Sequence, residues 1–171
     1  MKKMILSLLL ALGALLPASA QKFALVDMEY ILKNIPAYER ANEQLNQISK
    51  KWQSEVEALN NQAQTLYKNY QNELVFLSAE QKKQREQAIL DKEKEASDLK
   101  KKYFSPEGEL YKKRESLIGP IQDEIYVAVK GIAEQRGLAL VLDRASDNGI
   151  VFASPTADIS NEVLAKLGYS K

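Results

Sequence analysis

Apolar residues between positions 38 and 78 recur at a helical spacing. Nearly every third or fourth residue is apolar or small, with an average spacing close to 3.6, which indicates one stripe along an α-helix. Such a helix has roughly 40 residues and is about 60 Å long. Because this is too long for a compact domain of this size, we expect the helix to project. The stripe comprises Leu45, Ile48, Trp52, Val56, Leu59, Ala63, Leu66, Tyr70, Leu74 and Leu77.

A second helix is predicted to run back beside the first. Residues 77–81 have the character of a turn, and Ser78 followed by Gln81 fits a capping box that opens the new helix. Few apolar residues interrupt the charged ones before Tyr103, and the periodicity then becomes stronger. The later apolar face consists of Leu110, Leu117, Ile121, Ile125, Val129 and Ile132. We therefore expect residues 38–119 to form a helical hairpin, called the arm below.

Two breaker sequences interrupt the returning helix. Residues 105–108 read Ser-Pro-Glu-Gly and residues 119–120 read Gly-Pro. Each should kink or locally unwind the helix, because proline lacks a backbone donor and clashes with the preceding turn. The expected hinge residues are therefore Pro106, Gly108, Gly119 and Pro120.

The first break also predicts a contact across the arm. If the chain reverses near Ser78, Trp52 on the outgoing helix lies beside the Ser-Pro-Glu-Gly break. Tyr103 and Phe104 immediately precede that break. We expect Trp52 to pack against this aromatic pair and to hold the arm together there.

Short elements are predicted at both ends of the chain. Residues 23–26 favour a strand, and Asp27 can cap a short helix that ends before Pro36. Gly137 favours the end of the returning helix. The segment LVLDRASDNGIVFA, residues 140–153, predicts a β-hairpin of strands 138–142 and 150–153, turned at Asp147-Asn148-Gly149. A last helix, 159–167, would be capped by Asp158 and ended by Gly168.

Three short strands make a poor hydrophobic core. The strand near the start must meet the hairpin near the end, so both chain ends should lie at the base of the arm. We expect residues 21–37 and 120–171 to form a β-containing body whose strands are completed by other subunits. The fold class is thus α+β, predominantly α, with a long helical-hairpin arm projecting from a small β body. The expected body core or subunit interface is Phe23, Leu25, Leu140, Leu142, Val151 and Phe152.

Residues 1–20 have the pattern of a secretory signal peptide. Lys2 and Lys3 precede an apolar run too short to span a bilayer, and residues 18–20 read Ala-Ser-Ala, a small-residue cleavage site. Cleavage after Ala20 would leave a chain beginning at Gln21 that works outside the cytoplasm. The run is not followed by a cysteine that could carry a lipid.

Composition argues against several functional classes. The sequence has no His and no Cys, and so lacks the commonest general base, the thiol nucleophile and the usual zinc ligands. We expect no enzyme, no cofactor and no metal. Without Lys2 and Lys3 the chain has 22 basic and 23 acidic residues, a net charge of −1. Nucleic-acid binding is therefore not expected, because it normally requires a basic excess.

The order of these features resembles the Skp/OmpH family of periplasmic chaperones. The resemblance rests on the leader, a short strand ending in Val-Asp, the charged helical hairpin and the C-terminal GLALVLDRASDNGIVFASPTADISNEVLAKLG. It implies a homotrimer whose strands build a small body and whose three arms enclose a cavity. It further implies a periplasmic holdase that binds unfolded outer-membrane proteins without ATP. The absence of a phosphate-binding G-x-x-x-x-G-K-[ST] motif agrees with this.

Client contacts are expected at the arm tip. Tyr67, Val75 and Phe76 lie off the apolar stripe, and either pack in the tip turn or face clients. Basic residues near the tip and farther along the returning helix either attract acidic client segments or lipid headgroups, or form a solvated face. These are Lys82, Lys83, Arg85, Lys100, Lys101 and Lys102.

Two other functions remain open from the sequence. The chain could be a scaffolding coiled coil of the cell envelope whose arms bind one fixed partner. Contact with a membrane surface would be weak, because the arms lack a broad apolar face paired with a basic one.

Overall fold

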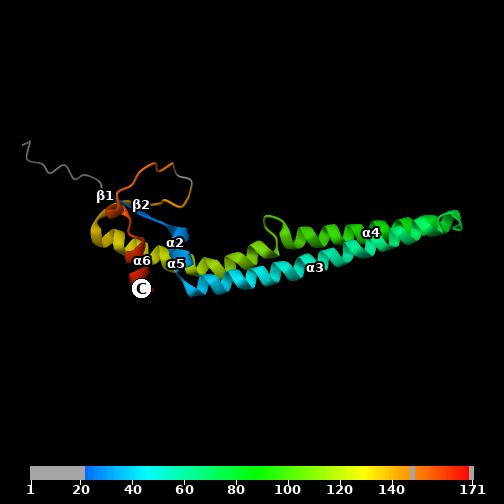
Figure 1. Cartoon of the computed structure of the whole chain (residues 1–171), viewed down its shortest axis with the longest axis horizontal. Coiled ribbons are helices and arrows are strands. Elements are labelled where there is room, and N and C mark those ends of the chain that lie inside the picture. Colours follow the sequence, from blue (N-terminus) through cyan, green and yellow to red (C-terminus); the bar gives the residue numbers. More distant parts are fainter. Residues whose placement is uncertain (1–21, 147–148, 170–171) are drawn as a thin grey trace, which may run out of the picture.

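The computed structural model describes residues 22–146 and 149–169, and the predicted leader lies outside them. A long two-helix arm extends from a small body that contains both ends of the described chain (Figure 1). No helix in the described ranges is long and apolar enough to cross a membrane. In chain order the elements are β1 (Lys22–Val26), α2 (Met28–Lys33), α3 (Pro36–Glu73), α4 (Ala79–Phe104), α5 (Glu109–Arg136), β2 (Leu138–Asp143), the 3-10 helix η1 (Pro155–Ala157) and α6 (Ser160–Lys166).

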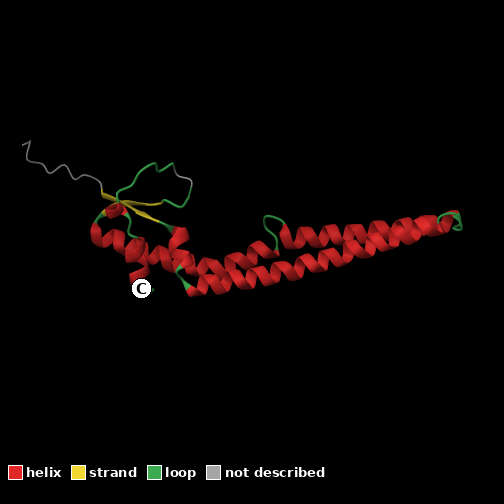
Figure 2. Cartoon of the chain, in the orientation of Figure 1, coloured by secondary structure: helices red, strands yellow, loops and turns green. Residues whose placement is uncertain are grey.

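Helix α3 forms the outgoing half of the arm. Pro36 stands in its first turn, where the missing backbone donor costs nothing and the fixed φ favours the helix. All residues of the predicted apolar stripe are buried or partly buried, and the returning helices run beside α3 (Figure 2). The helix ends at Glu73, four residues before the last position of that stripe. Its buried residues are Ala41, Leu45, Val56, Ala63 and Tyr70.

The capping box at the start of α4 is confirmed. The Ser78 hydroxyl accepts a hydrogen bond from the Gln81 N–H at 3.3 Å, and the Ser78 N–H donates to the Gln81 side chain at 2.9 Å. Two helix-end donors are thereby satisfied. The two residues fix where the chain turns back at the tip.

The first predicted break is confirmed, whereas the local unwinding predicted at Pro120 is wrong. Helix α4 ends at Phe104 and α5 begins at Glu109, and the intervening residues bulge out as a loop (Figure 1). At Pro120, by contrast, α5 continues without interruption. Ile118 and Ile121 on either side of this proline are buried in the molecule, so tertiary packing holds the helix together there.

The body has a two-stranded parallel sheet in the described chain, formed by β1 and β2. Phe23 lies opposite Leu140, and Leu25 lies opposite Leu142. The chain ends therefore meet at the base of the arm, as predicted. One face of β1 packs on α2, α5 and α6. This core includes Ala24, Val26, Ile31, Ile125, Ile132 and Val163.

The predicted β-hairpin is wrong. Residues 150–153 belong to no strand, and the described residues 149–154 run as a loop up to η1 (Figure 2). Asp147 and Asn148 of the predicted turn lie outside the described residues. The Asp143 carboxylate accepts hydrogen bonds from the N–H groups of Ala145 and Met28. The bond from Ala145 makes a local turn directly after β2, and the bond from Met28 joins this turn to the start of α2.

A polar cluster ties the two ends of this loop to the sheet. Arg144 forms ion pairs with Asp27 and Asp158, at 3.2 Å in each case. The Asp158 carboxylate also accepts hydrogen bonds from the N–H and the hydroxyl of Ser160, the first residue of α6. The N–H of Asp27 in turn donates to the Ser160 hydroxyl. The Asp158 carboxylate thus satisfies the Ser160 N–H at the start of α6. This contact is close to the capping role predicted for Asp158.

Candidate functional site

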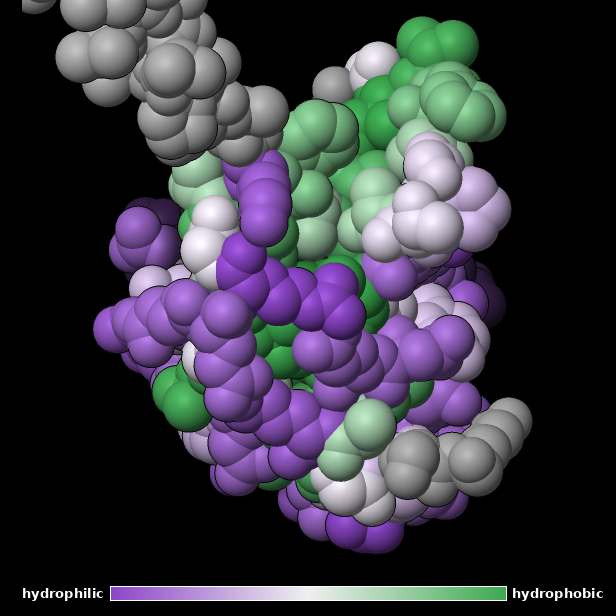
Figure 3. Space-filling model, turned by 90° about the vertical axis from the view of Figure 1, so that its left-hand side faces the viewer, coloured by the Kyte–Doolittle hydropathy of each residue, from purple (hydrophilic) through white to green (hydrophobic). Residues whose placement is uncertain are grey.

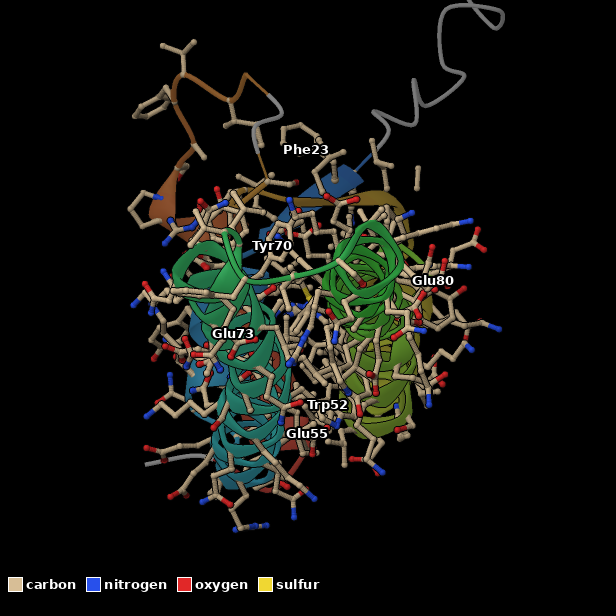
Figure 4. The ribbon with its side chains drawn as sticks, turned by 90° about the vertical axis from the view of Figure 1, so that its right-hand side faces the viewer. Phe23, Trp52, Glu55, Tyr70, Glu73 and Glu80 are labelled. Atoms are coloured by element: carbon tan, nitrogen blue, oxygen red, sulfur yellow. The ribbon has the colours of Figure 1, made fainter. Side chains whose placement is uncertain are left out.

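The arm is held at its break by an aromatic cluster. Trp52 of α3 stacks on Tyr103 of α4, with ring centroids 4.5 Å apart and planes inclined by 5°. Phe104 meets Tyr103 edge to face at 6.2 Å. The structure therefore brings together the three aromatic residues singled out in the sequence. In Figure 4, which views the molecule from the tip, Trp52 and Glu55 lie between the two sides of the arm.

Two tyrosine–carboxylate hydrogen bonds join α3 to α4. The Tyr103 hydroxyl donates to Glu55 at 2.7 Å, and the Tyr70 hydroxyl donates to Glu86 at 2.5 Å. In each pair the bond to the carboxylate raises the pKa of the tyrosine, because ionisation would break the bond and place two negative charges together. The bonds lie near the break and near the tip. They fix the alignment of the two helices along the arm.

The arm tip exposes large apolar side chains. Val75 and Phe76 in the turn after α3 are 82% and 85% exposed, and Tyr67 is about half exposed at 53%. The sequence left open whether these residues pack in the turn. In the described chain they face solvent, which makes the tip available for contact with another molecule.

The predicted basic residues differ in their surroundings. Arg85 forms an ion pair with Glu73 across the tip at 3.1 Å, and both side chains are roughly half exposed. Lys83 is exposed near the start of α4, and the neighbouring Lys82 is partly covered. The three lysines at 100–102 are exposed near the break, where the Lys102 ammonium lies 5.8 Å from the Tyr103 ring centre.

The four predicted hinge residues lie in two different settings. Pro106 and Gly108 lie in the loop between α4 and α5. A side chain at Gly108 would have its Cβ 2.8 Å from the Tyr103 carbonyl oxygen, so glycine is required there for space. Gly119 and Pro120 lie within continuous helix. The break in the arm is therefore at 105–108.

The body presents a hydrophobic surface beside the sheet. Val151 and Phe152 in the loop after β2 are 99% and 85% exposed, and Phe23 and Leu140 are more than half exposed. Figure 3 views the molecule from the body end and shows hydrophobic residues grouped on one side of the body. Leu25 is buried within the single chain and Leu142 is partly buried. We call Phe23, Leu140, Val151 and Phe152 the body patch.

Sequence reasoning missed a row of uncharged polar residues on α3. Asn42, Asn46 and Ser49 line a hollow of about 400 Å³ beside Phe104. A second hollow of about 310 Å³ continues along α3 past Gln53 and Asn60. The signal was present, since the residues from Asn42 to Gln53 recur every three or four positions beside the apolar stripe, and Asn60 follows two turns later.

In the described parts of the chain, no cluster of three or more acidic, histidine or cysteine side chains is placed to hold a metal ion. What the geometry offers is a set of contact surfaces: the tip, the row along α3 and the body patch. Comparisons with known proteins bear directly on what such surfaces do. The family model for OmpH-like outer membrane proteins matches residues 22–167, nearly the whole described chain.

The chain belongs to the OmpH-like family. It is 28% identical over 163 residues to the chaperone protein Skp of Yersinia enterocolitica, and the match covers 94% of each chain. The fold is also similar to the crystal structure of a protein described as an OmpH-like outer membrane chaperone of Caulobacter crescentus. That match has a TM-score of 0.65 and 12% identity, and it covers 87% of this chain and 85% of the other.

The resemblance inferred from the sequence is thereby confirmed. Members of the Skp/OmpH family are chaperones and not enzymes, which agrees with the interpretation drawn from the absence of histidine and cysteine. In this OmpH-like chain, the surfaces described above are therefore candidate binding surfaces for other polypeptides.

Proposed function

We propose that this OmpH-like protein is an ATP-independent periplasmic holdase that binds unfolded outer-membrane proteins and prevents their aggregation. The chaperone relatives support the activity, and the leader pattern at residues 1–20 supports the compartment. Val75 and Phe76 at the tip provide apolar contacts that do not depend on one particular client sequence.

The observation that carries the proposal is the combination of an extended arm with an uncovered body patch. Val151 and Phe152 are almost fully exposed in the single chain, although exposure of such side chains to water is unfavourable. A hollow of about 560 Å³ between Phe23, Arg136 and Thr156 lies at the same edge. Further copies of the chain would cover these groups. We propose a homotrimer with a cavity between its three arms, in keeping with the family resemblance.

The loop at 105–108 is the proposed hinge of each arm. The continuous helical pattern of backbone hydrogen bonds is interrupted between Ser105 and Gly108, where one bond, from the Gly108 N–H to the Ser105 carbonyl, closes the loop. Bending here therefore disturbs fewer hydrogen bonds than bending within a helix. Trp52 and Tyr103 would limit the bend, because their stacked rings join the two sides next to the loop. A hinge of this kind lets one cavity hold clients of different sizes.

Light scattering tests the proposed activity. An outer-membrane β-barrel protein unfolded in urea is diluted into buffer with and without the purified chain, in the absence of nucleotide. We expect the chain to suppress scattering at a stoichiometric concentration, whereas serum albumin at the same mass concentration does not. Equal scattering with the chain and with albumin would refute the holdase activity.

A further inference from the structure

Several uncharged polar residues of α3 share one face of the helix. Successive residues of an α-helix are about 100° apart, so positions 42, 46, 49, 53 and 60 fall within about 60° of one another. Leu45 and Val56 lie at the inner edge of this row, where they are buried against the returning helices. Asn42 and Asn60 are roughly 27 Å apart along the helix. The row thus extends along about half the length of α3.

The two hollows beside this row share one wall residue. Phe104 lines both hollows, and therefore stands between them. Leu110 and Tyr111 continue the opposite wall towards the body. We call the combined feature the amide groove: an apolar floor, a row of amides and a hydroxyl on the α3 side, and an aromatic ring midway.

The amides of the groove are available to a ligand. In the described chain, the side chains of Asn42, Asn46 and Asn60 make no hydrogen bonds, and Gln53 bonds only to Ser49, at 3.3 Å. Each amide can both donate to a peptide carbonyl and accept from a peptide N–H. Neutral amides pair with a peptide backbone whatever its side chains are, which suits a ligand of variable sequence.

The charges around the groove define its ligand further. The row is neutral from Asn42 to Gln53, and Arg114 lies at its body end. Beyond Gln53 the second hollow is lined by one exposed carboxylate and one cation, Glu57 and Lys100. Neither cation takes part in an ion pair with another described residue. An occupant should therefore be uncharged in its middle and carry a carboxylate near Arg114.

We propose that the amide groove binds one extended segment of an unfolded client, about eight residues long, with alternating apolar residues facing its floor. An extended chain advances about 3.3 Å per residue, so eight residues match the groove. Strands of outer-membrane barrels alternate apolar and polar residues over a comparable length. This inference rests on the proposed function, because it names the part of the client that the arm recognises.

Single cysteines test the groove directly, because the chain has no cysteine of its own. Asn46→Cys and Asn60→Cys place a thiol in the groove, whereas the matched Gln47→Cys and Asn61→Cys place it about 100° away on the same helix. The rate of thiol alkylation is measured with and without a urea-unfolded outer-membrane β-barrel protein. With client at about four times its Kd, we expect about fivefold slower alkylation in the groove and no change at the control positions.

A charge substitution provides a second test. Asn46→Asp with Asn60→Asp removes two of the amide donors and adds two negative charges to the groove. We expect about tenfold weaker client binding, whereas Gln47→Glu with Asn61→Asp adds the same charge elsewhere and leaves binding unchanged.

The outcomes separate the groove from the proposed function. Equal protection of groove and control cysteines, or equal affinity of the two charge variants, would overturn the groove while the unsubstituted chain still keeps the client soluble. If the unsubstituted chain leaves the client to precipitate, both proposals are wrong.

Discussion

Individual residues of the arm matter mainly through contacts between α3 and α4. Apart from the aromatic cluster and the two tyrosine–glutamate bonds, α4 offers few apolar side chains; its buried residues are Ile89 and Ala96. Each aromatic contact therefore contributes a large share of the arm's stability. The two predictions at this scale concern Trp52 and the bonded tyrosines.

Trp52→Ala is expected to loosen the arm at its break. Removing the half-buried indole leaves Tyr103 without its stacking partner and should lower the free energy of unfolding by about 2 kcal/mol. Trp52→Phe retains an aromatic ring and should lose less than half of that. Urea unfolding followed by circular dichroism measures both variants. Identical unfolding midpoints for the parent and Trp52→Ala would mean that the stack does not support the arm.

The tyrosine–glutamate bonds predict a loss of stability at alkaline pH. Hydrogen bonds to Glu86 and Glu55 raise the pKa of Tyr70 and Tyr103 above the ordinary value of about 10. The unfolded chain therefore releases these protons at lower pH than the folded chain. Their stabilising contribution is complete below about pH 10 and is lost as pH rises through the raised pKa values.

Absorbance of the tyrosinate form during a pH titration measures this effect. Tyr70→Phe with Tyr103→Phe should remove two late-titrating groups, and unfolding should then depend less on pH above about 10. Tyr111→Phe is the control, because Tyr111 is exposed and makes no hydrogen bond within the described chain. A double variant that keeps the parent's late titration would contradict the assignment.

At the scale of elements, substitutions at two glycines are expected to change the stability of the chain in opposite directions. One glycine lies in the loop before α5 and the other lies within α5. Gly108→Ala places a Cβ against the Tyr103 carbonyl group and should destabilise the chain by about 1–3 kcal/mol. Gly119→Ala has open space around its Cβ within a helix and should stabilise by about 0.5–1 kcal/mol. Thermal unfolding of both variants measures the two changes in stability. Stabilisation by Gly108→Ala would mean that the loop is not tightly packed.

Local signals in the sequence were sufficient to predict most helices and the two strands of the sheet. The stripe along α3, the Ser78–Gln81 capping box and the left-handed Gly137 at the end of α5 depend on neighbouring residues alone. Pro120 could not be assigned in this way, because the neighbouring Ile118 and Ile121 are buried among residues that are distant in sequence. The 150–153 strand was predicted from local turn and strand signals, but β2 pairs with β1 and residues 150–153 join no strand.

The sequence pointed to one of the candidate surfaces and missed another. The sequence singled out Val75 and Phe76 because they lie off the stripe, but it left open whether they pack in the tip turn or face solvent. The amide groove was not predicted, because asparagine and glutamine on a helix normally indicate only a solvated face. Its recognition required the position of Phe104, which depends on the break at 105–108.

At the scale of the whole molecule, a single chain leaves its body patch uncovered and carries an arm with little packing of its own. Both features are accounted for if three chains share one body and their arms enclose a client. The central claim is therefore that the functional unit is a trimer with room for one unfolded polypeptide.

Native mass spectrometry of the chain beginning at Gln21 tests this claim most directly. The protein is measured alone and after dilution of a urea-unfolded outer-membrane barrel protein into it. We expect three copies alone, and three copies with one client after mixing. A trimer that leaves the client to precipitate would contradict the holdase function, and a monomer would contradict the assembly itself.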